Sequence, residues 1–325
     1  MKFRTEIRIR PFAEKIGYRN RILLLGSCFA DEMREKLRGL KFRASGNFSG
    51  PLFNPSSVAA ALRGTADTHP AAIEELRQDA DGRWFHYGVC TEADSPDPQA
   101  VLAYLDRTRE ALRREAEACD TLVVTFGTAW VYRLRETGET VANCHRQPQR
   151  LFERRRLSVG EIVGEWSELL RTRLRDKRVI LTVSPVRHAG DGLDGNCLSK
   201  STLRVAAAEL EERFTRVDYF PAYEILTDDL RDYRFYADDL VHPSRQAVEY
   251  VWEKFAEAAL DDRTRTLVRE AEEIAAVLNH RPFRPDSDAY RTLCERTLGR
   301  MRRLSAAEGM DFSEEIARLE AILSA

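Results

Sequence analysis

Short apolar runs alternate with longer amphipathic stretches through residues 1–260, and this alternation restricts the fold more than any other feature. Runs typical of buried strands cover 21–25, 121–126, 179–183 and 217–220, and helical spacing marks 29–40, 98–118, 159–175, 199–214 and 244–260. A strand that is apolar at every position is buried on both faces, as in a parallel sheet. Strands and helices that alternate in this way place helices on both faces of such a sheet. The sequence therefore predicts a three-layer α/β/α domain.

The segment 261–325 has a different pattern, in which helical periodicity continues without an intervening strand. Apolar residues recur at helical spacing in 267–278, 288–304 and 312–323. Pro282 and Pro285 predict a turn or short linker within this segment. We therefore expect two domains, with residues 1–260 as the α/β domain and residues 261–325 as a helical C-terminal extension.

Charge and cysteine content exclude several classes of protein. The 325 residues carry 51 Lys and Arg against 53 Asp and Glu, a near balance that a general nucleic-acid binder does not have. Six cysteines stand far apart with no Cys-x-x-Cys pair, so we expect reduced thiols and no bound metal. No apolar run approaches the ~20 residues of a membrane-spanning helix, and the first residues do not resemble a secretory signal. We expect a cytoplasmic protein without a cofactor.

A hydroxyl group stands at the junction between the first apolar run and the helix after it. Ser27 follows Gly26 directly, and the carboxyl ends of parallel strands are where open α/β sheets bind ligands. The N-terminus of the following helix can stabilise negative charge that develops there. Ser27 is therefore either a nucleophile or a residue that only caps the helix. Cys28 is a competing nucleophile, although a cysteine in such a place is more often a small buried residue.

A second motif combines an acid and a histidine three residues apart. Asp239 precedes His242 in a loop, and Pro243 and Ser244 predict the start of a helix. A serine nucleophile needs a base within hydrogen-bond reach, and the base needs an acid that orients it. The alternative is an ordinary capped loop with a surface histidine.

Taken together, the two motifs resemble the SGNH hydrolase superfamily, and the string Gly26-Ser-Cys-Phe-Ala30 is similar to the motif that names its GSCFA branch. The resemblance covers about 20–260 and includes, in order, Asn54-Pro55, Thr125–Trp130, Asn143-Cys-His145, Ser184–His188 and Phe235–Ser244. It implies a flavodoxin-like α/β/α fold with a parallel sheet. It also implies that Ser27 is the nucleophile, His242 the base and Asp239 the acid that orients His242.

The superfamily resemblance implies three groups that donate hydrogen bonds to an oxyanion. The first is the N–H of Ser27 itself. The second is a glycine N–H after the second strand, for which Gly50 is the best match and Gly46 a close rival. The third is an Asn side chain in a Gly-x-Asn-Asp block, and here the chain departs from the pattern. Ala129 and Trp130 stand where Asn and Asp would be.

Asn143 and His145 are the candidates for the missing side-chain donor. They follow the strand-like stretch 125–134 by a short turn, and a hairpin of this kind returns the chain toward its start. The alternative for Asn143 is a turn or cap residue. The alternative for His145 is a buried structural histidine.

Three residues are predicted to contact the substrate, namely His145, Arg187 and His188. The last two follow the predicted strand 179–183, so they lie near the carboxyl edge of the sheet. Arg187 and Lys200 could hold an anionic group of the substrate. The alternative is that these cations are solvated surface residues.

The function that follows from this resemblance is hydrolysis of an acyl ester through a Ser-His-Asp triad. Superfamily analogy alone suggests a small-molecule or carbohydrate ester as substrate, with O-acylated carbohydrates as one candidate class. An acyltransferase would use the same acyl-enzyme and pass the acyl group to an alcohol. A third alternative is a binding protein without catalytic activity, because position 129 lacks the Asn donor.

Overall fold

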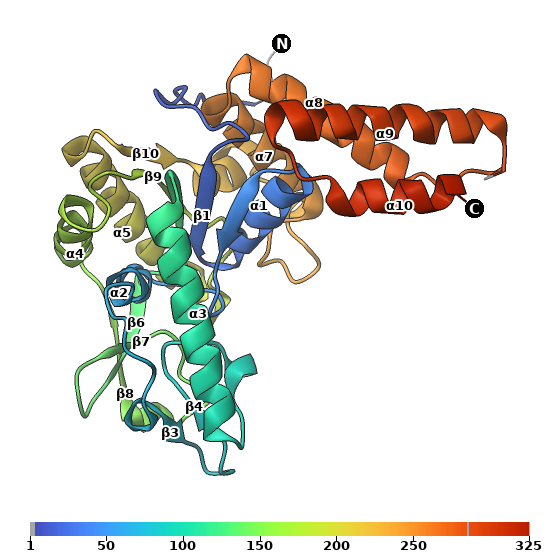
Figure 1. Ribbon diagram of the computed structural model, residues 1–325. Coiled ribbons are helices and arrows are strands. Elements are labelled where there is room, and N and C mark those ends of the chain that lie inside the picture. Colours follow the sequence, from blue (N-terminus) through green and yellow to red (C-terminus); the bar gives the residue numbers. More distant parts are fainter. Residues whose placement is uncertain (1–3, 285, 325) are drawn as a thin grey trace.

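Within residues 4–284 and 286–324, which the computed structural model describes, five parallel strands form a central sheet (Figure 1). The strands are β1 (Arg21–Gly26), β2 (Arg43–Gly46), β5 (Thr121–Phe126), β9 (Arg178–Val183) and β10 (Val217–Phe220). They pair in the order β10-β9-β5-β1-β2, and every neighbouring pair is parallel. The predicted α/β/α fold is confirmed, and this strand order is that of flavodoxin-like sheets.

The order of the strands also fixes where a ligand would bind. The chain moves from β1 outward to β2, and then returns to the other side of β1 to add β5, β9 and β10. The direction of winding therefore reverses between β1 and β5. Ligands of such sheets bind outside the carboxyl ends of the strands at this point of reversal. Ser27 follows β1 there, and Gly127 follows β5.

Helices cover both faces of the sheet (Figure 1). One face packs against α1 (Cys28–Gly39) and α7 (Arg245–Ala259), and the other packs against α2 (Pro55–Gly64), α4 (Val159–Arg171) and α5 (Gly192–Arg213). Successive strand residues point to opposite faces, so Leu24 and Val123 join the first core while Leu23 and Val124 join the second. Burial on both faces explains why the three inner strands, β1, β5 and β9, are apolar at most of their positions.

Two small antiparallel sheets form a lobe beside the central sheet, at the lower end of the long helix α3 (Pro98–Ala118) in Figure 1. The hairpin consists of β3 (Arg77–Gln78) and β4 (Trp84–Phe85), and the second sheet contains β6 (Trp130–Leu134), β7 (Thr140–Val141) and β8 (Phe152–Arg156). Strand β6 starts only three residues after Gly127. The lobe therefore builds one wall next to the carboxyl edge of the central sheet.

The C-terminal region is helical, with α8 (Asp262–Asn279), α9 (Asp288–Glu308) and α10 (Ser313–Ser324). Its apolar residues, including Met301 and Phe312, belong to the same core as α1 and α7. Pro282 lies between α8 and α9 as predicted, and Pro285 lies outside the described residues. The domain boundary at residue 260 stays a prediction. Across the described chain, no helix combines the length and the apolar character that spanning a membrane requires.

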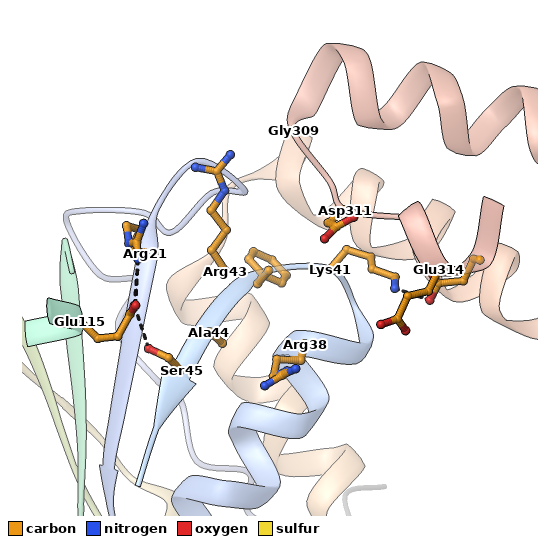
Figure 2. Close-up of a pocket in the computed structure, with 12 residues that line it drawn as sticks. Arg21, Arg38, Lys41, Arg43, Ala44, Ser45, Glu115, Gly309, Asp311 and Glu314 are labelled. Carbon is orange, nitrogen blue, oxygen red and sulfur yellow. Dashed lines mark hydrogen bonds and ion pairs between the residues drawn. The ribbon is translucent and has the colours of Figure 1, made fainter. Parts of the chain in front are cut away.

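A cavity of about 640 Å³ lies between this C-terminal region and the amino ends of β1 and β2. Figure 2 shows Arg21 and Arg43 on the strands and Asp311 and Glu314 on the C-terminal side. Lys41 forms an ion pair with Glu315 across it. The cavity is at the opposite end of the strands from Ser27, so it is separate from the candidate active site.

Candidate active site

Ser27 stands at the point of reversal, between the end of β1 and the start of α1. Its backbone is extended, with φ −67° and ψ 173°, and the residue is only 2% exposed. The side chain makes no capping hydrogen bond to α1, and its Oγ has no hydrogen-bond partner among the described residues. The structure therefore contradicts the alternative in which Ser27 only caps the helix. Four other buried hydroxyls of the described residues, those of Tyr18, Ser57, Ser167 and Thr182, also lack a partner, so what distinguishes Ser27 is its place at the carboxyl end of β1.

Gly127 forms the wall that faces Ser27 from the end of β5. A Cβ atom at this position would lie 3.2 Å from the Cβ of Ser27 and 2.9 Å from the carbonyl oxygen of Phe53. The N–H groups of Gly127 and Thr128 both donate to that Phe53 oxygen, at 2.8 Å each. Only a glycine allows the two chain segments to approach Ser27 so closely.

Asn47 holds the turn before Ser27 in place, a role that the sequence analysis missed. Its Oδ1 accepts the N–H of Gly26 at 3.0 Å, and its Nδ2 donates to the Gly26 carbonyl at 3.1 Å. Nδ2 also donates to Asp31 Oδ2 at 3.0 Å, and burial raises the pKa of that carboxyl group. The sequence does contain a feature that points to Asn47, because this residue is the first of the block 47–50 that resembles the family's second motif.

The two backbone N–H groups predicted to bind an oxyanion both already donate hydrogen bonds to backbone carbonyls. The N–H of Ser27 donates to the carbonyl of Thr125 at 3.1 Å, and the N–H of Gly50 donates to the carbonyl of Asn47 at 3.0 Å. Gly50 has a φ of +92° and closes a local turn, which explains the glycine without an oxyanion. The rival Gly46 lies within β2, paired with Leu24. Neither N–H group is therefore free to donate in this conformation, and their roles in an oxyanion hole stay predictions.

Asp239 and His242 form the hydrogen-bonded pair that the sequence predicted. The Nδ1 of His242 lies 2.6 Å from Asp239 Oδ2, while Asp239 Oδ1 accepts the N–H groups of Val241 and His242 at 2.9 Å each. These two backbone N–H groups, that of His242 first, lower the pKa of Asp239 to about 2. The His242 side chain is 50% exposed. Ser244 caps α7 as predicted, by accepting the Ala247 N–H at 3.3 Å.

Ser27 and His242 are not hydrogen-bonded to each other in this structure, because Ser27 Oγ has no partner in the described chain. The loop that carries His242 is tied to the carboxyl edge of the sheet through Arg187, whose N–H donates to the Val241 carbonyl at 3.1 Å. Catalytic hydrogen bonds are often long in proteins without substrate and shorten when substrate binds. The structure thus contains an oriented His242 imidazole near the sheet edge, but Ser27, His242 and Asp239 do not form one connected hydrogen-bonded group.

Arg187 supports this loop rather than projecting toward a ligand. Its guanidinium group lies over the rings of Tyr236 and Tyr233, 4.0 and 4.9 Å from their centroids. One of its nitrogens also lies 3.5 Å from the Leu240 carbonyl. The predicted substrate contact by Arg187 is therefore not present in this conformation.

Asn143 and His188 line a cavity of about 350 Å³ next to the Gly127 wall. Asn143 Oδ1 accepts the N–H of His145 at 2.9 Å, so the side-chain NH₂ is left as a donor. The Nδ1 of His188 lies 2.6 Å from Asp191 Oδ2, and burial lowers the pKa of His188. Aromatic and small polar side chains complete the wall, among them Phe53, Thr128, Trp130 and Tyr132. The cavity thus contains two of the residues predicted to act on the substrate.

His145, in contrast, cannot touch a substrate in this structure. Its side chain is fully buried and stacks on Phe85, with ring centroids 4.8 Å apart. Nε2 lies 3.0 Å from the Val89 carbonyl, and Nδ1 lies 2.8 Å from Asp94 Oδ1. The prediction of substrate contact by His145 was wrong, and its alternative as a structural histidine is confirmed.

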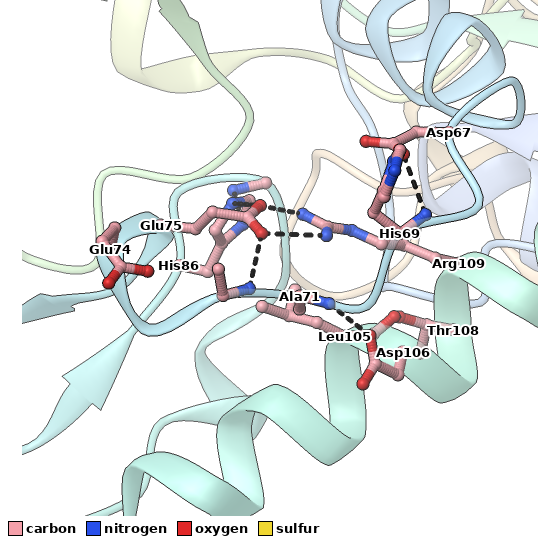
Figure 3. Close-up of polar contacts among 12 residues, drawn as sticks. Asp67, His69, Ala71, Glu74, Glu75, His86, Leu105, Asp106, Thr108 and Arg109 are labelled. Atoms are coloured by element: carbon pink, nitrogen blue, oxygen red, sulfur yellow. Dashed lines mark hydrogen bonds and ion pairs between the residues drawn. The ribbon is translucent and has the colours of Figure 1, made fainter.

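A polar cluster supports this part of the lobe (Figure 3). Glu75 accepts hydrogen bonds from Arg109 and lies 3.8 Å from the Nε2 of His86. Burial lowers the pKa of His86 to about 4, and its Nδ1 accepts the Gly88 N–H at 2.9 Å. The cluster therefore orders the segment around His86, whose neighbours Phe85 and Val89 contact His145. Nowhere in residues 4–284 and 286–324 do three or more His, Cys, Asp or Glu side chains form a group that could hold a metal ion.

Replacing His145 with alanine should destabilise the fold. The change removes a buried ring and leaves the Asp94 carboxylate without its partner, which costs roughly 3–5 kcal/mol in the free energy of unfolding. Denaturant unfolding of the variant measures this loss. His69→Ala is the control, because His69 contacts Asp67 in a similar way but is exposed. Equal stability of the two variants would contradict the structural role.

For Lys200 the sequence left two possibilities open, a contact with an anionic substrate group and a solvated surface cation, and the buried position of the side chain supports neither. The residue is 1% exposed, and its Nζ donates to the carbonyl oxygens of Gly127 and Ser184 at 2.7 and 2.8 Å. The neighbouring Ser199 Oγ accepts the N–H of Ala129 at 2.8 Å and lies 3.1 Å from Thr128 Oγ. Helix α5 therefore holds the segment that follows β5 and faces Ser27.

Comparisons with known proteins identify a family for most of the chain. The GSCFA family model matches residues 21–255, and the model described as "GSCFA domain protein, C-terminal domain" matches residues 271–325. No curated protein matches the chain. A solved structure from Streptococcus pneumonia, provisionally named a platelet activating factor, is similar at 12% identity with a TM-score of 0.39. That match covers 73% of this chain and 83% of the other, and so low a TM-score supports no functional conclusion.

Proposed function

The chain belongs to the GSCFA family, and from this premise we propose that it is a serine esterase of the SGNH type that hydrolyses an acyl ester. In this proposal Ser27 is the nucleophile, His242 is the base and Asp239 orients His242. The substrate is a small-molecule or carbohydrate ester, with O-acylated carbohydrates as the leading class. No cofactor takes part.

One observation carries the proposal. The Ser27 hydroxyl lies at the point of reversal of a flavodoxin-like sheet, is buried and has no hydrogen-bond partner in the described chain. The side chain of a structural serine at this N-cap position would accept an N–H of α1, and the side chain of Ser27 does not. Leaving a buried hydroxyl unpaired costs about 1–3 kcal/mol. Catalysis is a reason to keep it.

The proposed reaction proceeds by acyl transfer to Ser27. His242 Nε2 takes the Ser27 proton as Oγ forms a bond to the ester carbonyl carbon. The ester C–O bond then breaks, and the departing alcohol receives the proton from His242. Water attacks the acyl-enzyme in the same way, releases the acid and returns the proton to Ser27. Because Asp239 keeps its negative charge down to about pH 2, it stabilises the imidazolium throughout.

The cavity beside Gly127 supports the substrate class. It is large enough for a small ester, and its walls combine aromatic faces with a few polar groups, as small-molecule sites do. The Asn143 amide and the His188 ring give directional contacts to hydroxyl or acyl oxygens. Because Ser27 itself is covered, the substrate must displace part of the wall that Phe53 and Gly127 form.

A fluorophosphonate probe tests the proposal directly. We expect the probe to phosphonylate Ser27, identified by peptide mass spectrometry, and p-nitrophenyl acetate to be hydrolysed at a rate above that of the buffer. If wild-type protein is not labelled and does not cleave the ester, the proposal fails and a binding protein takes its place. If product forms only with an added alcohol such as methyl glucoside, the protein is an acyltransferase.

Asn143→Ala should lower turnover about 10²–10³-fold and leave KM nearly unchanged. Removing one oxyanion donor typically has this effect, because the hydrogen bond forms mainly in the transition state. Asn143→Asp is the informative companion, since it keeps an oxygen that accepts the His145 N–H and replaces the NH₂ donor with a carboxylate oxygen, which would repel an oxyanion. Full activity of the Asp variant in steady-state kinetics would show that Asn143 is a turn residue only.

A further inference from the structure

Lys200 is the most deeply buried cation near Ser27, and the mechanism above does not use it. Its side chain is 1% exposed, and its two hydrogen bonds go to backbone carbonyls, those of Gly127 and Ser184. No acidic side chain of residues 4–284 or 286–324 lies within ion-pair distance of Nζ. A buried ammonium group without a carboxylate is costly to the fold. Such a group is therefore a candidate for a functional role.

The contacts of Lys200 reach Ser27 through a single residue. Nζ donates to the carbonyl of Gly127, and a Cβ added to the same glycine would lie 3.2 Å from the Cβ of Ser27. The second bond, to Ser184, joins the carboxyl end of β9 to that of β5. Lys200 thus bridges two strand ends directly beside the candidate nucleophile.

The segment that Lys200 holds is the one that departs from the superfamily pattern. Position 129 carries an alanine that is 0% exposed, where the pattern has an Asn side chain. Ser199 binds the N–H of Ala129, and Lys200 binds the carbonyl of Gly127. Two adjacent residues of α5 therefore bind the backbone of the segment that carries position 129.

We propose that Lys200, in its protonated form, is a positioning residue that holds the Gly127 wall against Ser27 and supplies the positive charge that offsets the missing Asn donor at position 129. This inference rests on the proposed function, because it requires an oxyanion at Ser27. The ammonium group of Lys200 donates to the carbonyl of Gly127, the residue that forms the wall facing Ser27. In a water-free surrounding, charge at this range stabilises a developing oxyanion strongly.

The proposal predicts a pH dependence of a particular sign. Burial lowers the pKa of Lys200 to about 7. The titratable groups that face it are the Cys28 thiol on α1, His188 after β9 and the Tyr223 ring, whose centroid is 5.8 Å from Nζ. Since the cation is the active form, the rate must fall as the pH rises through about 7. His242 must be neutral to act as a base, so its titration makes the rate rise with pH. The rising limb from His242 and the falling limb from Lys200 can therefore be distinguished.

The test compares three proteins by the rate at which a fluorophosphonate labels Ser27 between pH 5.5 and 9. The wild type should show a descending limb above about pH 7. Lys200→Met should label about 10²-fold more slowly at pH 6.5 and should lack the descending limb. Lys177→Met is the matched control, because Lys177 also donates to two backbone carbonyls, at 2.6 and 2.8 Å, at the amino end of β5. It should behave as the wild type.

Several outcomes would overturn the proposal. If the labelling rate of the wild type does not fall above about pH 7, the proposal is overturned. This outcome needs no variant, so it holds even if Lys200→Met fails to fold. If Lys200→Met is labelled at the wild-type rate, Lys200 has a structural role only. The same conclusion follows if the variant is labelled slowly but its rate still falls above about pH 7. A wild type that is labelled at no pH refutes the proposed esterase function together with this inference, whereas wild-type labelling with an unchanged Lys200→Met refutes the inference alone.

Discussion

Ser27→Ala should fold normally, hydrolyse no acyl ester and take up no fluorophosphonate. The fold is insensitive because Ser27 Oγ makes no hydrogen bond that the substitution would break. Removing an unsatisfied buried hydroxyl is neutral or stabilising, so the melting temperature should stay equal or rise slightly. Activity is lost completely because the oxygen that forms the acyl-enzyme is gone. Thermal unfolding and p-nitrophenyl acetate hydrolysis, measured on the same preparation, check both halves of this prediction.

Cys28→Ala is the control for the neighbouring nucleophile. Burial raises the pKa of the Cys28 thiol, so the reactive thiolate is scarce near neutral pH. The variant should therefore keep its activity. An inactive Cys28→Ala beside an active Ser27→Ala would replace the serine mechanism with a thiol mechanism.

The fold was predictable where burial imposes a repeating pattern. Helix α3 was expected over 98–118 and has those bounds, because Asp97 caps it and its apolar residues recur at helical spacing. The four predicted strands are buried along most of their length and lie in the central sheet. In the lobe, β6 lies within the strand-like stretch 125–134, but β3, β4 and β7 were not predicted from periodicity, since they have only two residues each. Strands so short are defined by their pairing partners rather than by their own composition.

The candidate site was predictable only where its contacts are local in sequence. The Asp239–His242 pair is three residues apart, and its spacing alone places the two side chains on one side of a turn. Lys200 and Gly127 are 73 residues apart, and no local pattern indicates that a lysine on α5 reaches the end of β5. The role of Gly50 stays a prediction for a related reason. Its positive φ serves a local turn, and a sequence pattern cannot tell a turn glycine from an oxyanion glycine.

Asp239→Asn should lower turnover by roughly 10²–10⁴-fold, the range of general acid–base catalysis. The Asn oxygen can still accept the N–H groups of Val241 and His242, so the loop should keep its shape. Its NH₂ group, however, would then face Nδ1 of His242 and donate to it. That contact places the imidazole proton on Nε2, where the base must instead accept the proton of Ser27. Steady-state kinetics and thermal unfolding should show a large loss of rate with little loss of stability.

The pH profile and a neighbouring acid separate this role from a structural one. Hydrogen bonds from the backbone N–H groups of His242 and Val241 keep the pKa of Asp239 at about 2, so Asp239 itself should produce no limb between pH 4 and 9. Any rise of the rate with pH in that window then reports the base and not its partner. Asp238→Asn is the matched control, because Asp238 is exposed and adjacent but precedes His242 by four residues. If Asp238→Asn is the damaging change and Asp239→Asn is harmless, the pair at 2.6 Å is a surface contact and His242 is not the base.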